Sequence, residues 1–173
     1  MKLLKTINPE NVSEEEVNKY SIREAARALV IDNQGHIAIL HVSKAGYYKI
    51  PGGGIEGEEN KEVALRRECM EEIGCDVDIL GEVGMILEYR KFSSEKQVSY
   101  CYIAKLKGKK GKPSFTDEES NNSFEELWLP YNEAIMLFHE NKTTDFEGSK
   151  YIVERDKTFL KEAKNTYPNL FNI

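Results

Sequence analysis

Three consecutive glycines between a strand pattern and a helix pattern constrain the fold of this chain more than any other feature. Residues 47–50 are a short strand-like run, Tyr-Tyr-Lys-Ile, which ends at Pro51, and the glycines 52–54 follow directly. A helical pattern of apolar residues then extends from Lys61 to Ile73. We therefore predict that a strand, a glycine loop and a helix form the central unit of an α/β fold.

The predicted helix has two different sides when its residues are placed at about 100° intervals. One side, which we expect to be buried, carries Val63, Leu65, Cys69, Met70 and Ile73. The opposite side carries Glu68, Glu71 and Glu72, and the small Ala64 leaves them accessible. Like charges at these spacings destabilise a helix by roughly 0.2–0.5 kcal/mol each, and no lysine in the patch offsets them. The three carboxylates are therefore expected to converge on a cation from outside the chain.

Carboxylate oxygens favour a hard divalent ion such as Mg²⁺ or Mn²⁺, which also binds waters and phosphate oxygens. A solvated acidic helix face is the alternative reading of the three glutamates. The dinucleotide motif G-x-G-x-x-G is formally matched by Gly52, Gly54 and Gly57. We reject that match, because a pyrophosphate at the helix N-terminus would be repelled by Glu56, Glu58 and Glu59 unless a metal intervened. Loop and helix together therefore predict a metal-mediated phosphate site.

The stretch from Gly53 to Cys75 resembles the Nudix box of the Nudix hydrolase superfamily. Its charged and glycine positions are filled at the family spacing by Gly53, Glu59 and the run Arg67-Glu68-Cys69-Met70-Glu71-Glu72-Ile73-Gly74-Cys75. Two cysteines stand where the family usually has a bulky aliphatic residue, and Glu58 replaces a common glycine. The preceding hairpin, Pro51-Gly52-Gly53 and Trp128-Leu-Pro130 also resemble the family's layout, so the likeness covers about residues 23–140.

The resemblance implies a Nudix-type α/β/α sandwich with a mixed sheet, and a Mg²⁺-dependent enzyme. Such an enzyme hydrolyses the diphosphate bond of a nucleoside diphosphate linked to another group, using a metal-activated water. The implied catalytic residues are Glu59, Arg67, Glu68, Glu71 and Glu72. The last three would hold the metal with the carbonyl of Gly52 or Gly53, while Glu59 and Arg67 would orient the carboxylates. A carboxylate from the helix or from a later loop would take the proton of the water.

Three further residues are candidates for binding the substrate. Lys44 ends a predicted strand and could contact phosphate, although an exposed lysine is the alternative. Tyr48 could stack on a base, although aromatic residues in strands more often belong to the core. The family often supplies an extra glutamate near the last strand, and we choose Glu119 from a set in which surface charge is the alternative for each: Glu118, Glu119, Glu125 and Glu126. Lys91 stands where ADP-ribose pyrophosphatases typically have a proline, which argues against ADP-ribose as the substrate. A nucleoside triphosphate or similar small nucleotide remains the broadest expectation.

The remaining patterns predict a single domain over residues 1–173, with helical extensions at both ends of a core at about 23–140. A hairpin is predicted from the strand patterns 25–32 and 36–42, and further strands at 85–92, 98–106 and 126–130. Helices are predicted from capping and periodicity at 13–19, 131–139 and 150–164. The last helix is expected to pack outside the sandwich or against a partner, which leaves a homodimer open.

Composition excludes several classes of protein. The 173 residues, with 40% hydrophobic and 31% charged side chains, describe neither a disordered chain nor a disulfide framework. A net charge of −6 opposes a nucleic-acid partner, and no apolar run predicts a membrane span or a signal peptide. We therefore expect a cytoplasmic protein with a small nucleotide as its partner. The alternative to an enzyme is a domain that senses a nucleotide without turnover, which degenerate glutamates would favour, but the box retains all of its glutamates.

Overall fold

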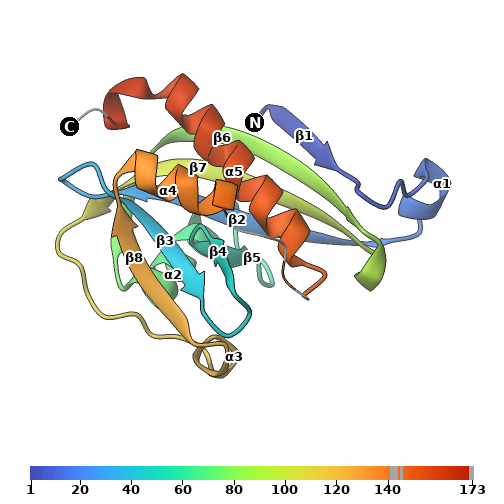
Figure 1. The fold of residues 1–173 in the computed structure, drawn as a ribbon, viewed down its shortest axis with the longest axis horizontal. Coiled ribbons are helices and arrows are strands. Elements are labelled where there is room, and N and C mark those ends of the chain that lie inside the picture. The colour runs from blue at the N-terminus through green and yellow to red at the C-terminus, as the bar shows by residue number, and fades with distance from the viewer. Residues whose placement is uncertain (141–143, 145, 172–173) are drawn as a thin grey trace.

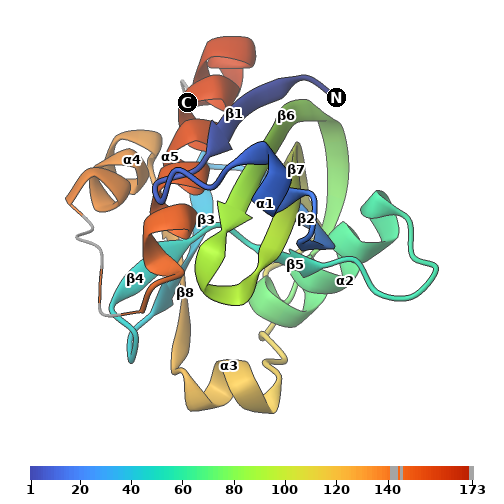
Figure 2. The same cartoon turned by 90° about the vertical axis from the view of Figure 1, so that its right-hand side faces the viewer.

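In the computed structural model, which describes residues 1–140, 144 and 146–171, a mixed sheet of eight strands lies between two layers of helices (Figures 1 and 2). Helix α2 (Lys61–Ile73) covers one face of the sheet. Helices α4 (Tyr131–Glu140) and α5 (Ser149–Thr166) cover the other. The predicted α/β/α sandwich is confirmed.

The sheet has the strand order β1-β6-β7-β2-β3-β4, with β5 beside β2 and β8 beside β3. Two neighbouring pairs, β1 with β6 and β2 with β7, are parallel, and the others are antiparallel. The strands are β1 (Leu3–Ile7), β2 (Ser21–Ile31), β3 (Ile37–Val42), β4 (Tyr47–Lys49), β5 (Gly52–Gly54), β6 (Asp76–Arg90), β7 (Glu95–Lys107) and β8 (Phe124–Leu129). The other elements are α1 (Glu14–Val17), α3 (Asp117–Asn121) and two 3₁₀ turns at Lys91–Ser93 and Pro168–Phe171.

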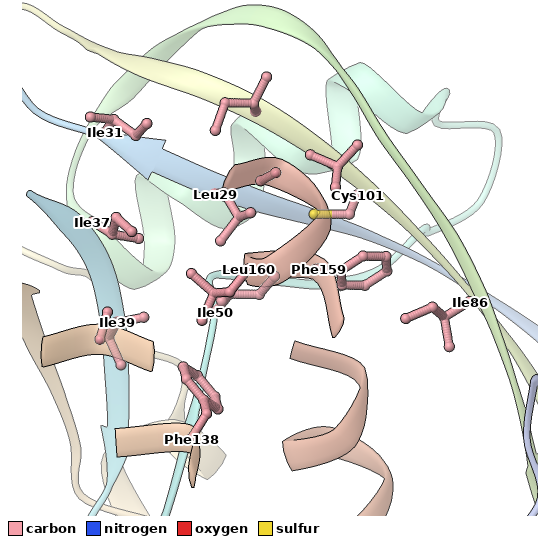
Figure 3. Packing of buried hydrophobic residues seen from close by; sticks show 14 of the residues in the cluster. Leu29, Ile31, Ile37, Ile39, Ile50, Ile86, Cys101, Phe138, Phe159 and Leu160 are labelled. Atoms are coloured by element: carbon pink, nitrogen blue, oxygen red, sulfur yellow. The ribbon is translucent and has the colours of Figure 1, made fainter. Parts of the chain in front are cut away.

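Strand β2 runs through the middle of the sheet, and its residues from Ala25 to Ile31 are buried on both faces. Ala26, Ala28 and Val30 belong to the core beneath α2. Leu29 and Ile31 alternate with them and belong to the core beneath α4 and α5, which Figure 3 shows. Because both faces are covered, the apolar run of β2 is nearly continuous instead of alternating with polar residues.

Helix α2 has the predicted limits because its ends carry clear signals. The Asn60 side chain accepts hydrogen bonds from the amides of Glu62 and Val63, both at 3.0 Å, and caps the first turn. Gly74 ends the helix with a left-handed backbone, φ 63°. Helix α1 is capped in the predicted way by Ser13, whose hydroxyl accepts from the Glu16 amide.

The predicted buried side of α2 was right for Leu65, Cys69 and Ile73, which are fully buried, and wrong for Val63 and Met70. Val63 and Met70, assigned to the buried side, are 49% and 50% exposed, whereas Glu68 and Glu72 are buried. The reason is the surface on which the helix lies: the predicted glycine loop is strand β5, and its three residues have no side chains to keep the glutamates away. The carboxylates therefore face into the protein and not into solvent.

Pairing of distant segments also changed the expected hairpin. Strands β2 and β3 pair in register only at Ile31 and Ile37, while β2 pairs with β7 along its whole length. Strands β1 and β5 and helix α3 were not predicted. The N-terminal segment thus supplies a sheet-edge strand in addition to its short helix.

Helix α5 packs directly on the sheet and not outside the sandwich. Its residues Tyr151, Phe159 and Leu160 are fully buried in this core, and Figure 3 labels Phe159 and Leu160. Arg155 and Asp156 on the same helix are also buried. Within the described residues, no helix has both the length and the apolar composition that crossing a membrane requires.

Candidate functional site

A cleft of about 350 Å³ opens where β4, β5 and α2 meet the segment that leads into β8. Three basic residues, Arg23, Arg27 and Lys49, line it together with the acidic residues Glu56, Glu68 and Glu72. The remaining lining residues are Tyr47, Gly52, Gly53, Gly54, Thr116, Asn122 and Phe124. Both signs of charge therefore meet in one hollow, on the strand that contains the glycines.

Glu72 is the most deeply buried carboxylate of the cleft. Its Oε1 accepts a hydrogen bond from Lys49 Nζ at 2.6 Å, and its Oε2 accepts one from the Gly52 amide at 2.6 Å. Burial raises the pKa of Glu72 to about 7, and the charge of Glu68 acts in the same direction, while Lys49 opposes both. The helix and the glycine strand are thus joined through this one side chain.

Glu68 lies directly against Gly53. A methyl group added to Gly53 would overlap the Glu68 carboxylate, so only glycine allows the helix to bring this group so close to the strand. Burial raises the pKa of Glu68 above its usual value, although the hydrogen bond from Arg67 acts in the opposite direction. Two partly or fully buried carboxylates, Glu68 and Glu72, therefore share the helix side of the cleft.

Arg67 connects the loop, the strand and the helix beside this cleft. Its Nε and Nη2 donate to the two carboxylate oxygens of Glu59, at 2.9 and 3.1 Å, and hold the pKa of Glu59 below its usual value. Nη1 donates to Glu68 at 2.9 Å and to Glu71 at 3.1 Å, and Nη2 donates to the Gly54 carbonyl at 2.9 Å. Arg67 and Glu59 are thus placed to orient the carboxylates of the helix.

The donors have the chemistry of a divalent-ion site, but they are paired with protein cations. Glu68 and Glu72 line the cleft, whereas Glu71 lies beside it against Arg67. In the described part of the chain, no three His, Cys, Asp or Glu side chains are grouped closely enough to share an ion. The Gly52 carbonyl, a predicted ligand, accepts a hydrogen bond from Arg27 Nη1. All-oxygen donors fit Mg²⁺ or Mn²⁺, and binding such an ion would require the carboxylates to exchange Lys49 and Arg67 for it.

The three candidate substrate contacts lie outside the lining of the cleft or cannot be placed. Lys44 is exposed, and its Nζ donates to the Asn121 carbonyl at 3.0 Å. Tyr48 stacks on His41 with ring centroids 4.6 Å apart, on the face opposite Tyr47. The backbone of Glu119 belongs to α3, but its side chain is outside the described residues. The tyrosine that lines the cleft is therefore the neighbour of the predicted one.

Sequence reasoning missed the basic side of the cleft and the support beneath it. Arg23 and Arg27 come from β2 and Lys49 from β4. Beneath them, Asp156 of α5 accepts a hydrogen bond from the Ile50 amide at 2.9 Å through Oδ2. A signal for Arg27 was present, because it is a single charge within the apolar run Ala-Ala-Arg-Ala-Leu-Val-Ile. Asp156 had no local signal.

Comparisons with known proteins agree with this architecture. The family model of the NUDIX domain matches residues 21–154. The MutT protein from Methanosarcina mazei Go1 is similar in structure with a TM-score of 0.60 at 15% identity, covering 86% of this chain and 98% of that one. The ORF135 protein of E. coli has a TM-score of 0.57 at 16% identity, covering 87% and 96%. The mMutator MutT protein from Bacillus halodurans has a TM-score of 0.54 at 19% identity, covering 76% and 80%. Comparison with curated proteins gives no match.

Proposed function

Because the chain belongs to the NUDIX domain family and is thereby a Nudix pyrophosphohydrolase, we propose that it acts on a small nucleotide with Mg²⁺ as its cofactor. The proposed reaction is hydrolysis of the diphosphate bond of a nucleoside triphosphate or similar compound. The observation that carries this proposal is the cleft itself: the carboxylates Glu68 and Glu72 lie on its helix side and basic residues line the same hollow.

The basic and the acidic side chains of the cleft have different proposed roles. Arg23 and Lys49 provide positive charge for the phosphate oxygens. Glu68 and Glu72, with Glu71 beside them, would hold Mg²⁺, and Mn²⁺ has the same donor preference. When bound, the ion supplies neutralisation of the diphosphate charge and a lowered pKa for an attacking water. Arg67 holds the carboxylates in orientation, and a carboxylate of the cleft accepts the proton from the water.

The proposal is tested by measuring the release of phosphate and pyrophosphate from nucleotides, dinucleotides and nucleotide sugars with and without Mg²⁺. Glu72→Gln keeps the shape of the side chain but removes its charge, and we expect it to lower the rate by roughly 100-fold or more. Glu62→Gln is the matched control, because Glu62 is exposed on the first turn of the same helix. An undiminished rate in Glu72→Gln would remove Glu72 from the catalytic set.

The alternative function is a domain that senses a nucleotide without turnover. It is favoured by the pairing of the carboxylates with Lys49 and Arg67, which occupies the groups that a metal would need. Nucleotide binding with no product from any compound of the panel, with Mg²⁺ or Mn²⁺ present, would select this alternative.

We also propose the cellular compartment and the partner of the enzyme. Its three cysteines are free and buried, which fits a reducing compartment such as the cytoplasm. The net charge of −6 supports a small nucleotide and not a nucleic acid as the partner. A single domain over 1–173 and a homodimer stay predictions, the second of which a light-scattering mass would test.

A further inference from the structure

Arg27 is a charged residue in the middle of a buried strand. Every residue of β2 from Ala25 to Ile31 is buried, and Arg27 itself is only 5% exposed. Its partners across the sheet are Gly52 on β5 and Cys101 on β7, neither of which is a counter-ion. A guanidinium in such a place is costly unless its donors are paired, so its presence requires a physical reason.

The hydrogen bonds of Arg27 are incomplete on the side chain's Nε. Its Nη1 donates to the Gly52 carbonyl, whereas Nε, which is itself closed off from solvent, has no hydrogen-bond partner among the described residues. Arg155, the other buried arginine of this layer, is satisfied: Nε and Nη2 donate to Asp156 at 2.6 and 3.1 Å, and Nη1 donates to Glu88 at 3.3 Å. Arg27 lines the cleft and Arg155 does not. The incompletely paired guanidinium therefore belongs to the arginine that lines the cleft.

The carboxylates around Arg27 are already engaged elsewhere. Glu72 is bonded to Lys49, and Glu88 and Asp156 are bonded to Arg155. Burial and the charge of Arg155 lower the pKa of Arg27 to about 10, which still leaves the guanidinium charged at neutral pH. An anion that enters the cleft is thus the group left to pair with the guanidinium charge of Arg27.

We propose that Arg27 binds a phosphate oxygen of the substrate's diphosphate from the strand side of the cleft, through its guanidinium. The planar guanidinium matches a phosphate with two parallel hydrogen bonds, which a lysine cannot reproduce. The Gly52 carbonyl holds the other edge of the group and fixes its direction. The identity of the anion as a diphosphate rests on the proposed function, while the binding of an anion by Arg27 does not.

The first test compares Arg27→Lys with wild type in titrations with inorganic pyrophosphate and with methylenediphosphonate, whose P–C–P bridge is not hydrolysed. Calorimetry without metal should show roughly tenfold or greater weakening in the variant, and the KM for the substrate should rise by a similar factor. Arg66→Lys is the control, because Arg66 pairs with Asp76 at 2.7 Å and does not line the cleft. Unchanged affinity and KM in Arg27→Lys would overturn the proposal.

A second measurement uses the wild-type protein and does not depend on a variant that folds. The Arg27 Nε–H resonance, assigned through its own side-chain carbons, should shift when either anion is added. An anion that binds without moving this resonance, or failure of wild type to bind either anion, would overturn the proposal.

The two proposals fail in different ways. A moving Arg27 resonance without hydrolysis would leave the anion site intact and remove the proposed reaction. Mg²⁺-dependent hydrolysis with an unmoved Arg27 resonance, and with an unchanged KM in Arg27→Lys, would support the proposed reaction and remove the anion site at Arg27.

Discussion

Asp156 holds the C-terminal helix against the strand that leads into the cleft, and its removal gives the sharpest test of the structure. The side chain is fully buried. Its Oδ2 accepts from the Ile50 amide at 2.9 Å and from Arg155 Nη2 at 3.1 Å, and its Oδ1 accepts from Arg155 Nε at 2.6 Å. Asp156→Ala would therefore leave one buried amide without its acceptor and one buried guanidinium with Glu88 as its remaining ion-pair partner.

Each loss has a known magnitude. A buried amide left without a partner costs about 1–3 kcal/mol. Truncating one member of a buried ion pair costs about 3–5 kcal/mol, and because both losses concern one side chain they are not simply additive. We expect the free energy of unfolding to fall by about 4 kcal/mol, which for a chain of this size corresponds to a decrease in Tm of roughly 8–16 °C.

The assay is urea unfolding at pH 7 followed by far-UV circular dichroism, with thermal melting as a second measure. Lys157→Ala is the control on the same helix, because Lys157 meets Glu154 only at 3.8 Å near the surface and should cost less than about 0.5 kcal/mol. Asp156→Asn keeps an oxygen for the Ile50 amide and should lie between the two. A loss below about 1 kcal/mol for Asp156→Ala, at an unchanged m-value, would show that these buried hydrogen bonds do not stabilise the fold as expected.

Two further predictions concern a glycine and an acid. Gly52→Ala should lower the free energy of unfolding by about 1–3 kcal/mol or more, because the φ of Gly52 is +130° and the new methyl group would overlap the Ala26 carbonyl. The control is Gly57→Ala, because a methyl group at Gly57 would meet open space. If urea unfolding gave Gly52→Ala a loss no larger than that of Gly57→Ala, the prediction would be contradicted. Burial raises the pKa of Asp32, but its hydrogen bonds, led by that from Lys110, lower the pKa by more than burial raises it. The pKa of Asp32 therefore lies below its usual value. The charged form therefore stabilises the fold above the unfolded-state pKa, about 3.9, and this stabilisation is lost as the pH falls through the lower folded-state pKa. Thermal melting from pH 7 to 2 should show the difference between wild type and Asp32→Asn narrowing below about pH 4, and a constant difference would contradict the prediction.

The helix Lys61–Ile73 shows how far local signals reach. Its limits were predictable because Asn60 and Gly74 act on the backbone next to them. Its periodicity correctly placed Leu65, Cys69 and Ile73 on the buried side, but it did not decide where the edges of that side lie. That choice depended on the strand beneath, where glycines admit Glu68 and Glu72 and leave Met70 exposed.

The candidate site also contains residues that local patterns predicted and residues that they did not. The spacing of Glu59, Arg67 and the helix glutamates was visible because one loop and one helix carry them all. Tyr47, Lys49 and Arg27 were missed, since a residue's place in a cleft depends on the face its strand presents, and one position along a strand reverses that face.

Local signals in the sequence were enough to predict helix α2, its caps and the family, because these depend on residues near each other in the chain. The parallel pairing of β2 with the distant β7, and the position of Asp156 of α5 beneath Ile50, depend on tertiary contacts. Those contacts join segments far apart in the chain and are selected by the burial of two cores at once. No local pattern encodes them, because their stability arises only when the whole sheet and both helix layers are assembled.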